Sequence, residues 1–395
     1  MPLRPPAGFI SAFFDPLNNP NAPTIGTATG GDASASVAFT APANVGGSAI
    51  SSYSARSTPG GVVASAASSP ISVTGLSNGT AYTFAVWATN TYGPSAYSAS
   101  SNSVTPAVAT RGLFGGGFNS GFSNINVISY ITVTTTGNAT DFGDLTNSRR
   151  FTMACSSQTR GVWGGGQNSD GDPLNVIDYV TILSTGNATD FGDLTLNGGQ
   201  GAGCSNSTRG LFAGGYMGIA INYITIASTG NATTFGNLIS GATSENAACA
   251  SSTRGIWGGG SSSNVIQRVT IATTGNAADF GDLTEARQGL TATSNSTRGL
   301  FAGGSVSGNV IDYITIASAG NAIDFGDLAL PLQTLAATSD STRAVFAGGL
   351  DGGTSEPVSA MRYVTISTTG NTTSFGNLTT ATRMFSGCSN GHGGL

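Results

Sequence analysis

The chain has 395 residues and a formal net charge of −5, only 8% of its residues are charged, and all 14 basic residues are arginine. Exposed helix faces depend on Glu and Lys, which are scarce or absent here, so the composition argues against a helix-rich fold and, since the chain is acidic, against a nucleic-acid partner. One histidine, His392, leaves little material for histidine-based catalysis or metal binding, while 39% hydrophobic residues are too many for a disordered chain.

The first segment, residues 1–22, is rich in proline and shows no secretory leader pattern. No run of 18 or more apolar residues in the chain predicts a membrane-spanning helix. Large apolar side chains cluster in the segment at Phe9, Ile10, Phe13 and Phe14. A segment this short cannot bury them alone, so it must pack on its own domain or on a partner. We favour a partner and expect an attachment arm, because the following domain has enough strands without it.

Residues 23–107 contain short alternating runs separated by turn residues, which predict a β-sandwich. Ala35, Val37 and Phe39 fall on one face of such a run. The Leu-x-x-Gly-Thr-x-Tyr segment that ends at Tyr82 resembles the tyrosine corner of fibronectin type III domains. This resemblance implies a fibronectin type III-like sandwich, followed by a short linker from Thr105 to Ala109.

An internal repeat governs the remainder of the chain, residues 108–395. The sequence Thr-Arg-Gly-Leu-Phe-Gly-Gly-Gly and its near copies begin at Thr110, Thr159, Thr208, Thr253, Thr297 and Thr342. A second block follows each copy in phase and is marked by Phe142, Phe191, Phe235, Phe280, Phe325 and Phe375. The spacing of 44 to 49 residues is typical of the blades of a β-propeller.

Each repeat is expected to form four short strands. In the second copy these cover 152–157, 160–163, 176–183 and 189–194. The Ser-Thr-Gly-Asn-Ala turn between the last two predicts a hairpin, because Gly and Asn tolerate positive φ.

The number of strands predicts how the repeats close. The first, small-residue strand precedes only the second to sixth copies, and its missing copy is the C-terminal segment 384–390, which aligns with 151–157. We therefore expect this last segment to complete the first blade by pairing with residues 111–114.

Residues 108–395 resemble kelch-like propeller repeats. That family has a strand ending in two glycines, a strand carrying a tyrosine, and an aromatic residue, usually Trp, before the next blade. In the third copy these positions hold Gly214–Gly215, Tyr223 and Phe235. The resemblance implies an all-β protein whose six-bladed kelch-like β-propeller follows the N-terminal sandwich.

Two sets of repeated side chains are candidates for chemistry. The arginines of the Thr-Arg turns are Arg111, Arg160, Arg209, Arg254, Arg298 and Arg343. They form either an anion-binding ring or a structural ring that holds carboxylates or backbone carbonyls between blades, and we favour the structural ring because residues repeated in every blade usually serve the blade. In-phase carboxylates that could be their partners are Asp141, Asp144, Asp190, Asp193, Asp279, Asp282, Asp324 and Asp327.

The four cysteines share one strand position. They are Cys155, Cys204, Cys249 and Cys388, and the other two copies have Thr293 and Thr338 there. Threonine replaces a small buried residue better than a metal ligand, so we expect buried thiols, no metal site and no cofactor. His392 lies in a glycine-rich tail that we expect to be a flexible end.

The loops differ in how much they vary among the copies. Turns between strands one and two, and between strands three and four, are near-invariant and share a face, whereas the other loops vary and share the opposite face. Loop diversity on a rigid scaffold is where binding sites are built. The candidate recognition residues in the variable loops are Phe118, Phe122, Asp170, Asp172, Tyr216, Met217, Asp351 and Glu356.

The sequence favours binding over catalysis. It lacks the two histidines of the copper oxidases built on kelch-like propellers and has no obvious Ser/His/Asp arrangement. Low-charge, glycine-rich repeats behind an adaptor sandwich are similar to virion proteins of tailed phages, such as tail fibres or surface appendages. This resemblance implies that the arm binds other virion proteins and that the propeller recognises a host-surface glycan or protein. It also implies an oligomer within a virion assembled in the host cytoplasm, without membrane insertion.

Two alternatives stay open. A carbohydrate-active enzyme on a propeller would be favoured by a carboxylate pair facing a deep pocket on the variable face. A bacterial surface adhesin would require an export signal.

Overall fold

The computed structural model describes residues 17–239, 244–305 and 308–395. The expected attachment arm, with its four large apolar side chains, lies almost wholly outside the described residues. Within them, no helix is long and apolar enough to span a membrane.

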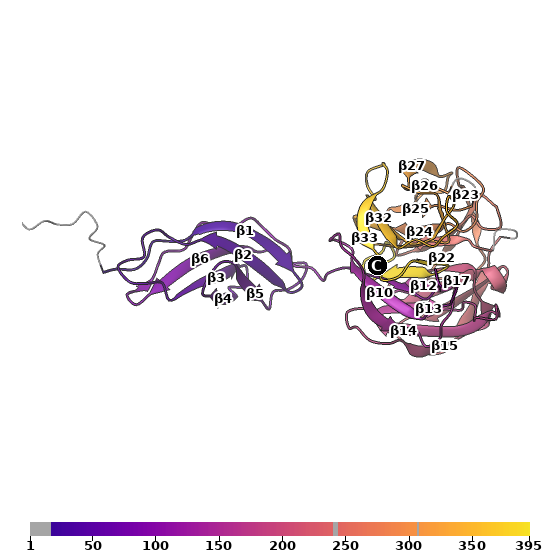
Figure 1. Ribbon diagram of the computed structural model, residues 1–395. Coiled ribbons are helices and arrows are strands. Elements are labelled where there is room, and N and C mark those ends of the chain that lie inside the picture. Colours follow the sequence, from indigo (N-terminus) through magenta and orange to yellow (C-terminus); the bar gives the residue numbers. More distant parts are fainter. Residues whose placement is uncertain (1–16, 240–243, 306–307) are drawn as a thin grey trace, which may run out of the picture. The chain divides into compact units, whose positions relative to one another are not determined.

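The chain divides into two compact units, Met1–Ala109 and Thr110–Leu395. Both are all-β in the described residues, where antiparallel sheets are accompanied by one short 3-10 helix, η1 (Gly215–Met217) (Figure 1). The all-β expectation is therefore confirmed.

The first unit contains two sheets that share one core. The first sheet has the order β1-β2-β5 and contains β1 (Thr24–Gly31), β2 (Ser34–Thr40) and β5 (Ile71–Thr74). The second has the order β4-β3-β6-β7 and contains β3 (Ser52–Thr58), β4 (Val63–Ala66), β6 (Thr83–Asn90) and β7 (Gly93–Pro94). Phe39 of β2 meets Tyr53 of β3 with ring centroids 4.6 Å apart. The Tyr82 hydroxyl accepts a hydrogen bond from the Ser77 backbone N–H at 3.0 Å.

The N-terminal end of this unit begins earlier than the sequence predicts, and part of the expected linker is bonded to the unit. The Asn18 N–H donates to the Gly46 carbonyl at 3.1 Å, so residues from Asn18 onward belong to the first unit and the expected arm of 1–22 is too long. The Ala107 N–H donates to the Gly31 carbonyl at 3.1 Å, so the expected linker is also shorter. A composition pattern cannot show which backbone groups of a terminal segment find partners.

In its described residues the second unit contains six four-stranded antiparallel sheets, each with the same internal order. The first strands, on one edge, are β12 (Met153–Ser156), β16 (Gly201–Ser205), β20 (Ala247–Ala250), β24 (Thr291–Ser294), β29 (Ala336–Ser339) and β35 (Ser386–Ser389). The second strands are β8 (Arg111–Gly115), β13 (Arg160–Gly164), β17 (Arg209–Gly214), β21 (Arg254–Gly258), β25 (Arg298–Ala302) and β30 (Arg343–Ala347).

The third and fourth strands complete each sheet. The third strands are β10 (Val127–Thr132), β14 (Leu174–Thr181), β18 (Ala220–Thr225), β22 (Val265–Thr270), β26 (Val310–Thr315) and β32 (Ala360–Thr365). The fourth strands are β11 (Thr140–Asp144), β15 (Thr189–Gly198), β19 (Thr233–Asn237), β23 (Ala278–Asp282), β27 (Ile323–Asp327) and β33 (Thr373–Asn377). Two short pairs lie outside these sheets, β9 (Phe118–Asn119) with β34 (Thr382–Arg383), and β28 (Leu332–Gln333) with β31 (Leu350–Asp351).

A bulge between the third and fourth strands recurs in all six sheets and explains the repeated Phe-Gly pair. In the second sheet Gly192 has φ +142°, and a Cβ there would lie 2.6 Å from the Gly230 carbonyl oxygen of the next sheet. Only glycine fits so close an approach at that φ.

The six first strands contact one another in cyclic order, from β12 through β16, β20, β24 and β29 to β35, which contacts β12. Serine hydroxyls bridge them: Ser205 Oγ donates to the Ser156 carbonyl at 2.6 Å, and Ser156 Oγ donates to the Ser389 carbonyl at 2.8 Å. Ser389 Oγ of β35 donates to the Ser339 carbonyl of β29, so the last sheet is linked to the first.

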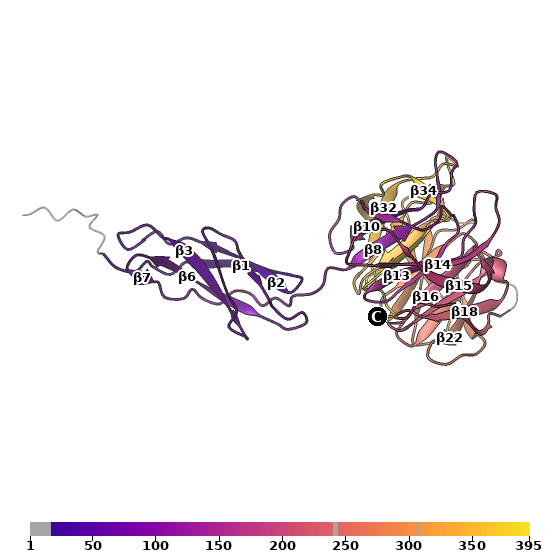
Figure 2. The same cartoon turned by 90° about the horizontal axis from the view of Figure 1, so that it is seen from below.

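The C-terminal strand completes the sheet that begins the unit, as the sequence predicts. β35 pairs with β8, and Gly387 is opposite Phe114 and Cys388 opposite Leu113. Figure 2 shows the yellow C-terminal part of the chain at the same end of the second unit as β8, with which β35 pairs. Phe385 is buried with its ring centroid 6.0 Å from that of Phe114.

Deleting residues 385–395 should lower the melting temperature of the second unit sharply, because β8 loses its edge partner and the Phe385 site empties. Deleting only residues 391–395 spares β35 and should have a much smaller effect. Calorimetry of the two truncated chains and of the intact chain measures both changes in melting temperature. Equal melting curves for the longer deletion and the intact chain would exclude a closing role for β35.

Candidate functional site

The six repeated arginines make structural contacts between sheets. Each Nη1 donates to a backbone carbonyl of the following sheet at N···O distances of 2.7–3.4 Å. The acceptors, taken from Arg111 to Arg343, belong to Ile182, Ile226, Ile271, Ile316, Ile366 and Val133. Five of the guanidinium groups also stack on the tyrosine of their own third strand. They have carbonyl partners, whereas the in-phase aspartates are not ion-paired in the described part of the chain.

The other near-invariant turn also joins sheets. Asn187 Oδ1 accepts the backbone N–H of Asp144 at 3.1 Å, and Asn231 Oδ1 accepts that of Asp193 at 3.0 Å. The invariant turns therefore use their polar groups to hold neighbouring sheets together.

The four cysteines are buried free thiols. Burial raises the pKa of Cys249 and Cys388 to about 12, so both are neutral and inert at ordinary pH. At the same position Thr338 Oγ1 donates to the Cys388 carbonyl at 3.0 Å. Within the described residues, no three His, Cys, Asp or Glu side chains gather as a metal site would require.

Adjoining cavities lie between the six first strands, and we call them the central cavity. Its middle is lined by small residues of all six strands, including Cys155, Cys204 and Thr293. One end is lined by His392 and the other by the connections that lead into the first strands. Glu245 is the one acidic residue of the described chain in this lining, so the central cavity holds no carboxylate pair of the kind a glycosidase uses.

His392 covers one end of the central cavity, so the expectation of a flexible tail is wrong. Its Nδ1 accepts the Gly394 backbone N–H at 3.1 Å, and Nε2 lies 3.2 Å from the Ser156 carbonyl oxygen. Only a neutral ring protonated on Nε2 makes both bonds. Burial lowers the pKa of His392 to about 4, and the bond to the Ser156 carbonyl opposes the shift.

The lowered pKa predicts how His392 affects stability. Because the unfolded chain binds this proton more readily, the contribution of His392 is complete above an unfolded pKa of about 6.5 and is lost as the pH falls towards 4. We expect a loss of about 1–2 kcal/mol, since His392 as a whole residue is only half-buried. His392→Gln should remove that part of the pH dependence in denaturant unfolding between pH 7 and 4. Parallel curves for the variant and the native chain would contradict the expectation.

A closed ring of backbone hydrogen bonds surrounds the opposite end of the central cavity. Its members, which we call the rim residues, are Phe151, Gln200, Glu245, Gly289, Thr334 and Met384. The N–H of each donates to the carbonyl of the preceding member at 2.6–3.3 Å, and Phe151 donates to Met384. All six have φ between +53° and +70°, although five are not glycine. Such backbone costs free energy, and non-glycine outliers of this kind gather at functional sites.

Polar groups that have no partner in the described part of the chain lie at this rim. Both side-chain polar atoms of Asn246 are buried there without a hydrogen bond. Burial raises the pKa of the neighbouring Glu245. This end of the central cavity can therefore hold water or a small polar group.

The variable loops place the predicted recognition residues in different settings. Phe122 is 71% exposed, and Asp170, Asp172 and Glu356 are also exposed. Tyr216 is exposed, and its hydroxyl is hydrogen-bonded to Gln167. The Asp351 carboxylate accepts the Gly353 N–H at 2.9 Å and so stabilises its own loop.

Met217 is not a recognition residue. Only 4% of it is exposed, and it packs in a core cluster with Met153 and Leu194. The loop at η1, which joins β17 to β18, packs against the neighbouring sheet that contains β12 and β15, which a loop sequence alone does not show.

Two arginines that the sequence analysis did not select flank Phe118. The Arg150 and Arg383 Cζ atoms lie 5.2 and 5.3 Å from its ring centroid, and the Phe122 ring lies edge-on to it at 6.3 Å. We call Phe118, Phe122, Arg150 and Arg383 the arginine–phenylalanine cluster. The sequence held a signal for them: both arginines immediately precede a rim residue, where the other four copies have Gly199, Ser244, Gln288 and Gln333.

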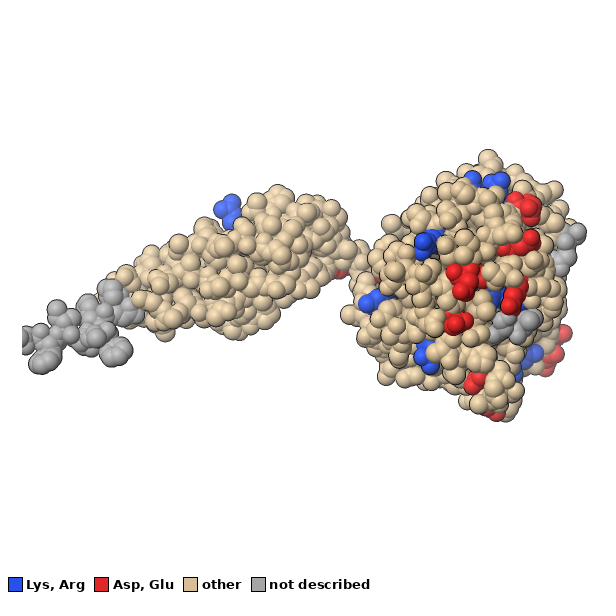
Figure 3. Space-filling view, turned by 90° about the horizontal axis from the view of Figure 1, so that it is seen from above, with Lys and Arg blue, Asp and Glu red and all other residues tan. Residues whose placement is uncertain are grey.

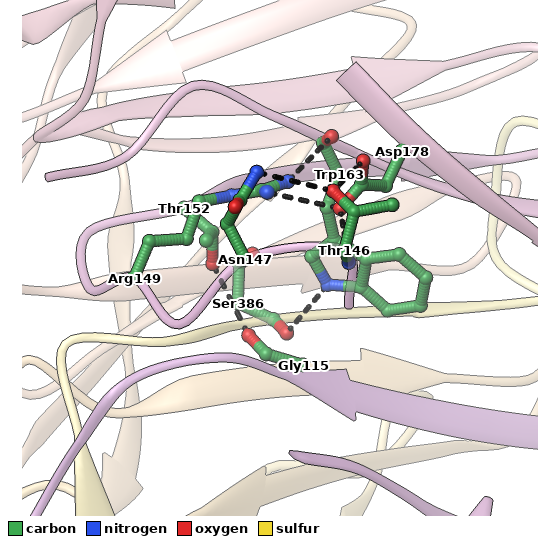
Figure 4. Close-up of polar contacts among 8 residues, drawn as sticks. All are labelled: Gly115, Thr146, Asn147, Arg149, Thr152, Trp163, Asp178 and Ser386. Atoms are coloured by element: carbon green, nitrogen blue, oxygen red, sulfur yellow. Dashed lines mark hydrogen bonds and ion pairs between the residues drawn. The ribbon is translucent and has the colours of Figure 1, made fainter. Parts of the chain in front are cut away.

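A buried ion pair anchors the segment that carries Arg150. Arg149 Nη1 lies 2.9 Å from Asp178 Oδ2 of the next sheet, with both side chains 0% exposed, and Arg149 Nη2 donates to the Trp163 carbonyl at 3.3 Å (Figure 4). Thr146 also donates to Asp178, with its Oγ1 at 2.7 Å. Burial lowers the pKa of Arg149, and Asp178 opposes the shift.

The third sheet lacks this ion pair and provides a natural comparison. There Asn222 replaces the aspartate and accepts Thr195 Oγ1 at 2.7 Å, with no arginine. Arg149→Met should therefore cost about 3–5 kcal/mol by leaving a buried carboxylate unpaired. The double variant Arg149→Met/Asp178→Asn should recover most of the lost free energy of unfolding, as measured by urea unfolding.

Arg209→Met is the matched control. It removes hydrogen bonds to carbonyls and a ring contact, so it should cost only about 1 kcal/mol. If Arg149→Met/Asp178→Asn were no more stable than Arg149→Met alone, the loss in Arg149→Met would not come from the unpaired Asp178 carboxylate.

The chain matches no family model and no curated protein sequence in the comparisons made.

Proposed function

We propose that this chain is a non-enzymatic structural protein of a tailed-phage virion, a tail fibre or surface appendage. It attaches by its N-terminal arm and presents the second unit for recognition of a host surface. The observation that carries the proposal is the contrast between the loops: invariant turns use their polar groups between sheets, whereas variable loops expose Phe122 and hold two half-buried arginines that are not ion-paired within the described residues.

The same proposal assigns the architecture of the second unit as a six-bladed kelch-like β-propeller. Three observations support this assignment. The described residues form six four-stranded sheets, the first strands of these sheets contact one another in cyclic order, and β35 completes the sheet of β8, β10 and β11. The closed ring formed by the rim residues supports it as well, because a cycle of six bonds needs its members arranged around one axis.

For the first unit we propose a fibronectin type III-like sandwich. Two sheets of three and four strands around one core support this assignment. The hydrogen bond from the Ser77 N–H to the Tyr82 hydroxyl has the form of a tyrosine corner.

A binding role agrees with the chemistry of the second unit. The cysteines are inert, and the single histidine is hydrogen-bonded at one end of the central cavity. Among the described residues, Glu245 is the one carboxylate in the lining of that cavity. The proposed partners are other virion proteins at the arm and a host-surface glycan or protein at the variable loops.

The attachment role predicts that deleting residues 1–16 leaves a folded, soluble chain that no longer joins its particle. The deletion spares Asn18, which is bonded to Gly46 and accepts the Asn90 side chain at 3.0 Å. Incorporation is measured by sedimenting particles and detecting the chain in them.

Two controls make this test specific. Replacing Phe9, Ile10, Phe13 and Phe14 by Ser keeps the length and should abolish incorporation equally. Phe122→Ala should be incorporated normally, since it lies in the proposed recognition surface. Normal incorporation of the truncated chain would place the anchor elsewhere, and binding of the intact chain to no cell surface would exclude the recognition role.

A further inference from the structure

The arginine–phenylalanine cluster brings together segments far apart in the sequence. Phe118 and Arg383 are directly paired across β9 and β34. Arg150 comes from the connection into the second sheet, and its backbone N–H and carbonyl both bond Gln167. The cluster therefore forms only when the chain closes, on a backbone held by the rim residues and by the ion pair of Arg149.

The guanidinium groups of this cluster have spare donors. Arg150 Nε donates to Gln167 Oε1 at 3.2 Å, whereas the buried Nε of Arg383 has no hydrogen-bond partner among the described residues. The two ion pairs of the described chain lie elsewhere. Burial and the charge of Arg150 lower the pKa of Arg383, and Glu356 is the nearby carboxylate that opposes the shift. Two like charges held together without a paired carboxylate form a site that an added anion stabilises.

Charged side chains are sparse in this protein, which makes the arginine pair distinctive. Uncharged residues cover most of the surface in view in Figure 3. The repeated arginines elsewhere are committed to carbonyls, so Arg150 and Arg383 are exceptions among the six copies. Residues that break a repeat are not needed by every sheet, and a binding role explains why they differ.

The exposed ring of Phe122 indicates what carries the anion. A flat apolar ring beside two guanidinium forks suits a ligand that has both an apolar face and an oxyanion. A pyranose with a carboxylate, sulfate or phosphate substituent has both, because its C–H groups pack on the ring while its anion receives bidentate hydrogen bonds.

We propose that Arg150 and Arg383 bind the oxyanion of an acidic saccharide whose sugar ring packs on Phe122. The inference rests on the proposed function and names the class of surface ligand: an acidic glycan, whose anionic group the two arginines select.

Calorimetric titration of the full chain tests the site with trigalacturonic acid, a sulfated lactose and a phosphorylated maltose, against neutral maltotriose and a pentaglutamate peptide. We expect at least one acidic sugar to bind about tenfold or more tightly than maltotriose, and Arg150→Gln and Arg383→Gln each to weaken it about tenfold. The tightest acidic probe identifies the oxyanion. A peptide that binds as tightly as the sugars, or acidic sugars that bind no better than maltotriose, would overturn the assignment.

Matched variants separate the site from general charge and exposure. Arg56→Gln removes an exposed arginine of the first unit, and Ile323→Ala removes a residue that is 58% exposed on another sheet. Neither should change binding, whereas Phe122→Ala should weaken it. Unchanged melting temperatures show that the variants are folded. Equal losses in the matched controls would mean that no local site exists.

A second arm distinguishes this inference from the function on which it rests. Surface polysaccharides from a panel of bacteria are offered to the chain before and after chemical reduction of their carboxylates. Selective loss of binding after reduction, and with Arg150→Gln/Arg383→Gln, supports the acidic site. Binding that survives both changes overturns the acidic site but leaves host recognition standing, and binding to no polysaccharide at all counts against both.

Discussion

The hydrogen bonds between β35 and β8 join the C-terminal strand to the strand with which the second unit begins. Without them, β8 would present an unpaired edge and the six sheets would be an open row. With them, each first strand has two neighbours, the serine hydroxyls find carbonyls in the next sheet, and the rim residues can close a cycle. The left-handed backbone of Thr334 and Phe151 is tolerated because this cycle satisfies its polar groups.

Neighbouring sheets are held by polar contacts of two kinds. One kind recurs in every copy, as when Arg160 donates to the Ile226 carbonyl. The other differs from copy to copy: Asp178 is paired with Arg149, whereas its counterpart Asn222 has no arginine beside it. Recurrence indicates a contact that every sheet needs, whereas variation shows where the chain can change without losing the fold.

The arginine–phenylalanine cluster lies where these two kinds of position meet. Its arginines directly precede rim residues, so a conformationally fixed backbone carries side chains that are free to vary. Arg150 is further held by its neighbour Arg149, whose guanidinium is locked between Asp178 and the Trp163 carbonyl. Rigid support beneath variable side chains is what a specific binding surface requires.

The sequence by itself determined the all-β character, the six copies and the pairing of the C-terminal strand, because strand periodicity, turn residues and a missing repeat element are local signals. It also indicated that the repeated arginines serve the sheets. Only the tertiary structure decided that their partners are carbonyls, that Met217 is buried and that His392 covers the central cavity. It alone brought Arg383 beside Phe118, because their contact depends on closure of the chain, and no short-range pattern encodes which distant side chains meet there.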